Sequence, residues 1–150
     1  MIHNYIYKMS SEQFSKLTVE ITRSLKKEEK KNYGIFITPR TIYCSLYSSV
    51  NAFLNGDFSG IRRILEPSCG TCEIVNYCDD MMRSVEIVGL ELNPTVYASI
   101  QSLTFKNTVR LYNTDFLHYF PEKEYDFIIG NPPYVVCNKT QFFHHRAPTL

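Results

Sequence analysis

The tetrapeptide Asn131-Pro132-Pro133-Tyr134 combines two hydrogen-bond acceptors, a stiff backbone and an aromatic ring. An amine conjugated to an aromatic base is a poor nucleophile. The Asn131 side-chain oxygen and the Pro132 carbonyl could accept both of its hydrogens and direct its lone pair toward an electrophile. The prolines would hold these acceptors in place, and Tyr134 offers a face on which a base taken out of a duplex can stack. Two prolines also simply end a strand, but that alternative leaves Asn131 and Tyr134 unexplained.

Other polar residues stand directly after apolar runs of the chain. The loop Glu66 to Cys72 (EPSCGTC) follows one run, Glu91 ends the next, and Asp115 follows a third. In a parallel sheet, these strand ends share one rim, where ligands bind. A tight loop brings backbone N–H groups to a nucleotide-like cofactor, an acid on the next strand accepts from ribose hydroxyls, and Asp115 could accept from an exocyclic amine. Each residue also has a simpler explanation, since a strand-end Glu is usually solvated and Asp115 could cap a short helix beginning at Phe116.

The loop EPSCGTC also contains a Cys-x-x-Cys, Cys69 to Cys72, which is typical of thiol redox proteins. A redox centre with a lowered Cys69 pKa is therefore an alternative to a cofactor loop, although it leaves the other strand-end residues unexplained. No metal site is predicted. Cys69, Cys72 and Cys78 lack a second pair or a suitably spaced histidine, and the adjacent His144 and His145 lack ligand spacing.

Apolar runs and helical patterns alternate from residue 63 onward. Strands are predicted at 63–66, 85–90, 109–112 and 125–129, and helices at 72–83 and 94–105, the second capped by Asn93 with Pro94 inside it. This alternation indicates an α/β fold with a parallel sheet and helical crossovers.

Two helices are predicted ahead of the sheet. The first is capped at Ser10-Ser11, continues through a charged run to Gly34, and has apolar residues at helical spacing, namely Phe14, Leu17, Ile21 and Leu25. The second has Thr38 as its N-cap, Pro39 at its first position, and one apolar face, namely Ile42, Leu46, Val50 and Phe53.

The chain has 150 residues, of which 44% are hydrophobic and 21% charged, as expected for one globular domain. No apolar run approaches the roughly 20 residues of a membrane span, and the N-terminus has no secretory pattern. Five cysteines, an odd number, fit a reducing compartment. We therefore expect a cytoplasmic protein that does not contact membranes. The net charge of +1 neither favours nor excludes nucleic acid as a partner.

The order of these segments resembles that of the S-adenosylmethionine-dependent adenine-N6 DNA methyltransferases, specifically the gamma-order enzymes of type II restriction-modification systems. The segments are GIFITP (34–39), LEPSCGTC (65–72), GLELNP (89–94), NTDFL (113–117) and IIGNPPYVV (128–136). The resemblance implies a Rossmann-like class I methyltransferase sheet, truncated after the fourth strand, with N-terminal helices. Residues 1–33 would form an N-terminal helical segment and residues 34–150 an incomplete methyltransferase domain, with the target-recognition domain absent.

The resemblance also implies residue roles. Asn131, Pro132, Pro133 and Tyr134 would engage a target adenine flipped out of DNA. The residues holding S-adenosylmethionine would be Thr38, Pro39, Glu66, Ser68, Gly70, Glu91, Leu92, Asp115 and Phe116. Thr38 would bind the cofactor's carboxylate, Glu91 its ribose and Asp115 its adenine amine.

Two departures from the family pattern shape the expectations. Cys72 stands where the family has the second loop glycine, which is unfavourable if that position needs a positive φ. The family's sheet continues beyond the tetrapeptide, so a C-terminal portion or a second chain would supply the remaining strands and target recognition. The alternatives are a catalytically inactive subunit that binds cofactor or DNA, and a methyltransferase acting on protein glutamine or RNA adenine.

Overall fold

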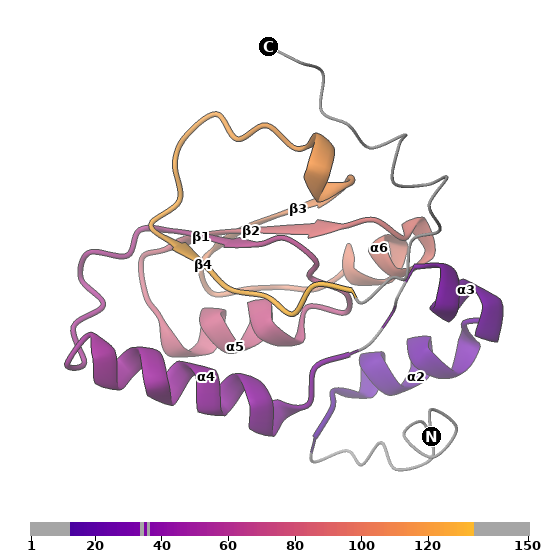
Figure 1. Ribbon diagram of the computed structural model, residues 1–150, viewed down its shortest axis with the longest axis horizontal. Helices are drawn as coiled ribbons and strands as arrows, with labels where there is room; N and C mark the ends of the chain where they lie inside the picture. Colours follow the sequence, from indigo (N-terminus) through magenta and orange to yellow (C-terminus); the bar gives the residue numbers. More distant parts are fainter. Residues whose placement is uncertain (1–12, 34, 36, 134–150) are drawn as a thin grey trace, which may run out of the picture.

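The computed structural model describes residues 13–33, 35 and 37–133. These residues contain a four-stranded parallel sheet with the strand order β3-β2-β1-β4 (Figure 1). The strands are β1 (Arg63–Glu66), β2 (Glu86–Glu91), β3 (Thr108–Asn113) and β4 (Phe127–Ile128). The predicted α/β fold with a parallel sheet is confirmed, and β1 has the predicted bounds.

The two faces of the sheet are covered differently. Helices α5 (Glu73–Met81) and α6 (Pro94–Ile100) form the crossovers. Together with α4 (Arg40–Phe53) they bury one main core, to which the strands contribute Ile64 and Ile87. The opposite face presents Leu65, Val88 and Leu90, packed against two tyrosines of the β3–β4 connection. That connection includes the short helix η1 (Phe116–His118) and lies across the sheet from α4 and α5 (Figure 1).

Three predicted elements are shorter in the structure. The helix predicted at 72–83 spans Glu73–Met81. The helix predicted at 94–105 ends at Ile100, because Leu103 and Phe105 turn inward to pack on the main core. The strand predicted at 125–129 is only two residues long. Ahead of it, the side chain of Asp126 accepts the backbone N–H groups of Arg62 and Arg63, and its own backbone N–H donates to the Arg63 carbonyl at 3.0 Å.

The predicted N-terminal helix is divided into α2 (Lys16–Ser24) and α3 (Lys27–Asn32). Leu25, which separates them, takes an extended conformation and is buried. The N-cap of α2 is Ser15, whose hydroxyl accepts from the Thr18 N–H, and not Ser10 or Ser11, which lie outside the described residues.

The prediction for the start and face of α4 was wrong. Its N-cap is Pro39 rather than Thr38. The expected apolar face is largely exposed, since Ile42 is 51% and Phe53 85% accessible. The helix instead buries Tyr43 and packs Tyr47 against Phe58 and Tyr77. Within the described residues, no helix has the length and hydropathy needed to cross a membrane.

Candidate active site at the carboxyl end of the sheet

A cavity opens where β1 ends and α5 begins. It is lined by residues from three separate segments that the sequence singled out: Thr38, Glu66, Ser68, Gly70 and Asn131. It is also lined by residues to which the sequence gave no role in holding the cofactor: Ile37, Cys69, Thr71, Glu73 and Ile74. The fold thus brings together the segment before α4, the loop after β1 and the segment after β4, which are far apart in the sequence.

Glu66 is the buried acid of this cavity. It ends β1, is 2% exposed, and accepts hydrogen bonds from the Ser68 N–H at 3.1 Å and the Ser68 hydroxyl at 3.3 Å. Burial raises the pKa of Glu66 to about 7, although the bonds from Ser68 act in the opposite direction. A buried carboxylate with so few donors is suited to receive a cationic group of a ligand.

Gly130 packs directly on Glu66. A Cβ at Gly130 would lie 2.5 Å from the Glu66 Oε1 and 3.0 Å from the Pro67 Cδ. The glycine before Asn131 therefore allows the segment after β4 to approach the acid of β1 closely.

We predict that Gly130→Ala lowers the free energy of unfolding by about 1–3 kcal/mol, because the added methyl group forces Glu66 or the backbone to move. Gly60→Ala is the control, since a Cβ there meets nothing within 4 Å. Urea unfolding of both variants measures the difference. Equal free energies of unfolding for the two would show that the close approach at Gly130 is not required.

Glu91 ties the loop after β1 to the end of β2. Its carboxylate accepts the Gly70 N–H at 2.9 Å and the Asn93 N–H at 2.6 Å, and the Cys69 N–H donates to the Leu90 carbonyl at 2.7 Å. Burial raises the pKa of Glu91, against the lowering effect of these backbone donors. Glu91, the predicted ribose acid, is therefore hydrogen-bonded directly to Gly70 of the predicted cofactor loop.

Cys72 has a positive φ, the backbone conformation that is unfavourable for a residue with a Cβ. Its φ is +66°, and that of Gly70 is +52°. Cys72 is also fully buried and forms the N-cap of α5. A side chain here is held in a left-handed conformation that disfavours any residue with a Cβ.

The redox alternative is disfavoured by the surroundings of Cys69. The thiol is 6% exposed, and its hydrogen bond with Cys72, together with burial, raises its pKa well above the ordinary value. The lowered pKa that a reactive thiol would need is not found. Among the described residues, no cluster of three or more His, Cys, Asp or Glu could hold a metal ion.

Thr38 and Asn131 are joined by a hydrogen bond. The Asn131 Nδ2 donates to the Thr38 Oγ1 at 3.2 Å, which links two segments 93 residues apart. Thr38 is buried, whereas Pro132 and Pro133 are exposed and Pro39 is half-buried. Tyr134, the predicted stacking residue, lies outside the described residues.

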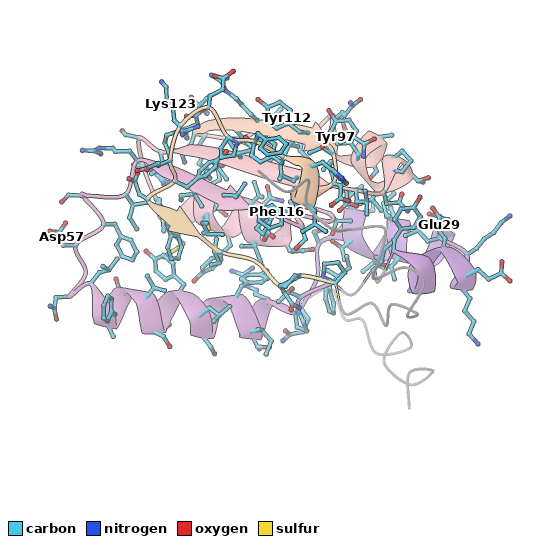
Figure 2. The ribbon with its side chains drawn as sticks, turned by 45° about the horizontal axis from the view of Figure 1, so that its top comes forward. Glu29, Asp57, Tyr97, Tyr112, Phe116 and Lys123 are labelled. Carbon is cyan, nitrogen blue, oxygen red and sulfur yellow. The ribbon has the colours of Figure 1, made fainter. Side chains whose placement is uncertain are left out.

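The remaining predicted residues do not line the cavity. Asp115 accepts the Leu117 N–H at 3.0 Å and caps η1, as its simpler explanation anticipated. Leu92 and Phe116 are each about half exposed, at 50% and 46%. Figure 2 labels Phe116 on the short helix that follows β3. The Thr114 N–H donates to the Glu91 carbonyl at 3.2 Å, so the segment leading to Asp115 is tied to the end of β2.

The sequence predicted no individual role for Thr71 or Glu73. Both are buried and belong to a hydrogen-bond network with Thr18 of α2. Glu73 is the first residue of α5, where an acid is favoured by the helix dipole, and this position was the available signal.

Comparison with solved structures defines the class of fold. The plantazolicin methyltransferase BpumL, solved in complex with SAH, superposes with a TM-score of 0.51 over 87% of this chain and 50% of its own, at 18% sequence identity. The described sheet and its crossovers therefore have the Rossmann-like fold of class I methyltransferases, as predicted. No protein-family profile matches the chain.

Sequence relatives narrow this class. The chain is 39% identical over 129 residues to the modification methylase CviBIII of Paramecium bursaria Chlorella virus NC1A, and 33% identical over 121 residues to the type II methyltransferase M.CvrRI of Paramecium bursaria Chlorella virus XZ-6E. These matches cover 85% and 81% of this chain but only 33% and 30% of the two relatives. A tRNA1(Val) (adenine(37)-N6)-methyltransferase of Aliivibrio salmonicida is 31% identical over 61% of this chain and 42% of its own length. The predicted resemblance to restriction-modification methyltransferases is confirmed, and the chain spans about a third of the length of the two viral relatives.

Proposed function

We propose that this chain carries the cofactor-binding and methyl-transfer part of an S-adenosylmethionine-dependent adenine-N6 DNA methyltransferase. The observation that supports the proposal best is the cavity itself. It joins the Thr38 hydroxyl, the buried Glu66 carboxylate, the Gly70 loop and the Asn131 amide around one space.

The chemistry of these groups fits S-adenosylmethionine. The Thr38 hydroxyl can donate to the cofactor's carboxylate, and Glu66 can pair with its ammonium group. Such a pairing would compensate for the burial of the Glu66 charge. Glu91 still has lone pairs for ribose hydroxyls beside its two backbone donors. Asp115 and Phe116 would meet the adenine, with Leu92 on its other side.

When bound, S-adenosylmethionine supplies a methyl group on a positively charged sulfur, ready for in-line displacement. The chain's own contribution is to place the nucleophile. The Asn131 Oδ1 and the Pro132 carbonyl would accept the hydrogens of the target adenine's amine, and the two prolines would keep both acceptors still. Positioning of this kind lowers the barrier and should matter more than acid–base chemistry, and the proton that the methylated amine must lose passes to water.

DNA is the proposed substrate because the two viral relatives are named as a modification methylase and a type II methyltransferase. Target recognition is assigned to segments other than the described residues, in the same polypeptide or in a second chain. The described sheet is open on the β4 side, where Ile128 is 59% exposed, so further strands could be added there.

RNA adenine is the second candidate substrate, favoured by the similarity to the tRNA methyltransferase. Transfer of labelled methyl groups from S-adenosylmethionine to DNA, RNA and protein, measured in parallel, separates these substrates. Label in adenine of DNA supports the proposal, and label in RNA or in glutamine redirects it. Titration calorimetry with S-adenosylmethionine tests the alternative of a catalytically inactive subunit. No heat at millimolar cofactor would favour a subunit that does not bind the cofactor.

We predict that Cys72→Gly tightens S-adenosylmethionine binding by up to about ten-fold, because a glycine removes the strain of the positive φ from the cofactor loop. Cys72→Ala is the control, since it removes the thiol and keeps the strained Cβ, and its affinity should match that of the wild type. Calorimetry measures all three proteins. Unchanged or weaker binding by Cys72→Gly would show that strain at this position does not limit affinity.

A further inference from the structure

The loop after β1 is held from the side of the N-terminal helices as well as from β2. Thr18 of α2 is fully buried, and its hydroxyl meets both the Thr71 hydroxyl and the Glu73 carboxylate. Because the single Thr18 hydrogen goes to the carboxylate, Thr71 must donate its own hydrogen to Thr18. Thr71 stands between Gly70 and Cys72, the two residues of this loop that have a positive φ. The contact therefore fixes the most strained part of the loop.

Glu73 joins this network to three helices. It is the first residue of α5, accepts the Ser15 N–H at the start of α2 at 2.8 Å, and lies 3.5 Å from the Tyr43 hydroxyl of α4. A carboxylate at the N-termini of two helices is stabilised by both helix dipoles. The loop is thus fixed against α2 by a charge-assisted network that is shielded from water.

The turn after β2 has a similar contact. The side-chain amide of Asn93 donates to Glu29 of α3 at 3.1 Å, and the Asn93 N–H donates to Glu91. Asn93 is fully buried and caps α6 through its side-chain oxygen. Figure 2 shows Glu29 and Asp57 at opposite ends of the molecule. Glu29 of α3 lies at the end toward which β2 and β3 point in Figure 1.

We propose that the N-terminal helices are part of the cofactor site, with Thr18 and Glu29 acting as positioning residues for the two turns that hold S-adenosylmethionine. Thr18 holds the loop after β1 in position through Thr71 and Glu73. Glu29 holds the turn after β2 in position through Asn93. This inference rests on the proposed function for the identity of the ligand, but the positioning itself can be measured without the ligand.

The test compares Thr18→Val with Thr22→Val. Both threonines are buried in α2, one turn apart, but the Thr22 hydroxyl has no hydrogen-bond partner among the residues that the structure describes. Valine keeps the shape of threonine and replaces the hydroxyl with a methyl group. Thr18→Val should weaken S-adenosylmethionine binding about ten-fold and speed amide hydrogen exchange in residues 69–72. Thr22→Val should change neither quantity.

Further variants separate positioning from simple destabilisation. Thr18→Ser keeps the hydroxyl and should restore the wild-type affinity. Thr71→Val removes the same contact from the loop and should reproduce the effect of Thr18→Val, even if Thr18→Val fails to fold. Glu29→Ala should weaken binding and Glu28→Ala, its exposed neighbour, should not.

Two results distinguish failure of this inference from failure of the proposed function. Equal exchange rates in residues 69–72 for Thr18→Val and Thr22→Val would overturn the positioning role, whatever the cofactor. Faster exchange in Thr18→Val would support the positioning role. If the wild-type protein at the same time binds no S-adenosylmethionine, the proposed cofactor is overturned and the positioning role is not.

Discussion

Asn131→Ala should slow methyl transfer to DNA by at least about 100-fold, while the affinity for S-adenosylmethionine changes only a few-fold. The asparagine is proposed to accept a hydrogen from the target amine, an interaction that strengthens as the amine becomes a nucleophile. Its loss therefore raises the barrier of the chemical step. The bond from the Asn131 Nδ2 to Thr38 is the part that could affect the cofactor, and a single such hydrogen bond contributes about 1 kcal/mol.

Single-turnover transfer of labelled methyl groups measures the rate, and calorimetry measures the affinity. Asn51→Ala is the control, because it removes an exposed asparagine near the end of α4 that does not line the cavity. A transfer rate for Asn131→Ala within a few-fold of wild type would remove the asparagine from the mechanism. A large loss of cofactor affinity, with an unchanged rate of methyl transfer once the cofactor is bound, would assign Asn131 to cofactor binding instead.

Glu66→Gln should stabilise the fold and weaken cofactor binding at the same time. The pKa of Glu66 is raised from 4.5 to about 7, so the folded protein holds a proton more tightly than the unfolded chain between these pH values. Stability therefore falls as the pH rises from about 4.5 to about 7 and then levels off. Above pH 7 the buried charge costs about 3 kcal/mol, which the neutral glutamine avoids.

The glutamine retains an oxygen that can accept the Ser68 N–H, so the packing at Gly130 is preserved. It lacks the negative charge proposed to pair with the cofactor's ammonium, and affinity should fall ten-fold or more, since a hydrogen bond to a charged group contributes about 1.5–3 kcal/mol.

Urea unfolding at pH 5 and pH 8, with calorimetry at pH 8, tests both halves of this prediction. The wild type should lose stability between the two pH values because of Glu66, and Glu66→Gln should lose about 2.5 kcal/mol less, since part of the effect is already present at pH 5. Glu122→Gln, a change at an exposed acid, should behave as the wild type. A variant that is less stable than the wild type at pH 8 would show that the Glu66 charge is compensated within the fold.

Some of this architecture followed from local sequence. The run Arg63 to Glu66 is a strand at its predicted bounds, and Asn93 caps α6 as expected. Strands and caps of this kind depend on side chains only a few residues apart. The parallel arrangement then placed Glu66, Glu91 and Asn113 at one rim, because parallel strands end on the same side of a sheet.

Other features depended on contacts between distant segments. Ile42 and Phe53 fit the spacing of a buried face, yet α4 turns its tyrosines inward because Phe58 and Tyr77 are there to receive them. Thr18 gave no signal as a buried residue, since its partners Thr71 and Glu73 lie more than fifty residues away. Asp115 has the cap role that the sequence allowed, and its role toward the cofactor stays a prediction.

The sequence by itself determined the order of the strands' polar ends and the identity of the groups that could do chemistry, because both are properties of short segments. Only the tertiary structure decided how those groups meet. Glu66 is an acid with a raised pKa because Gly130 and the loop exclude water from it, and Cys72 is strained because α5 and the loop require a positive φ there. Burial and backbone strain arise from neighbours that are distant in sequence. The pattern of residues could therefore identify the site, but only the fold determined the raised pKa of Glu66 and the strain at Cys72.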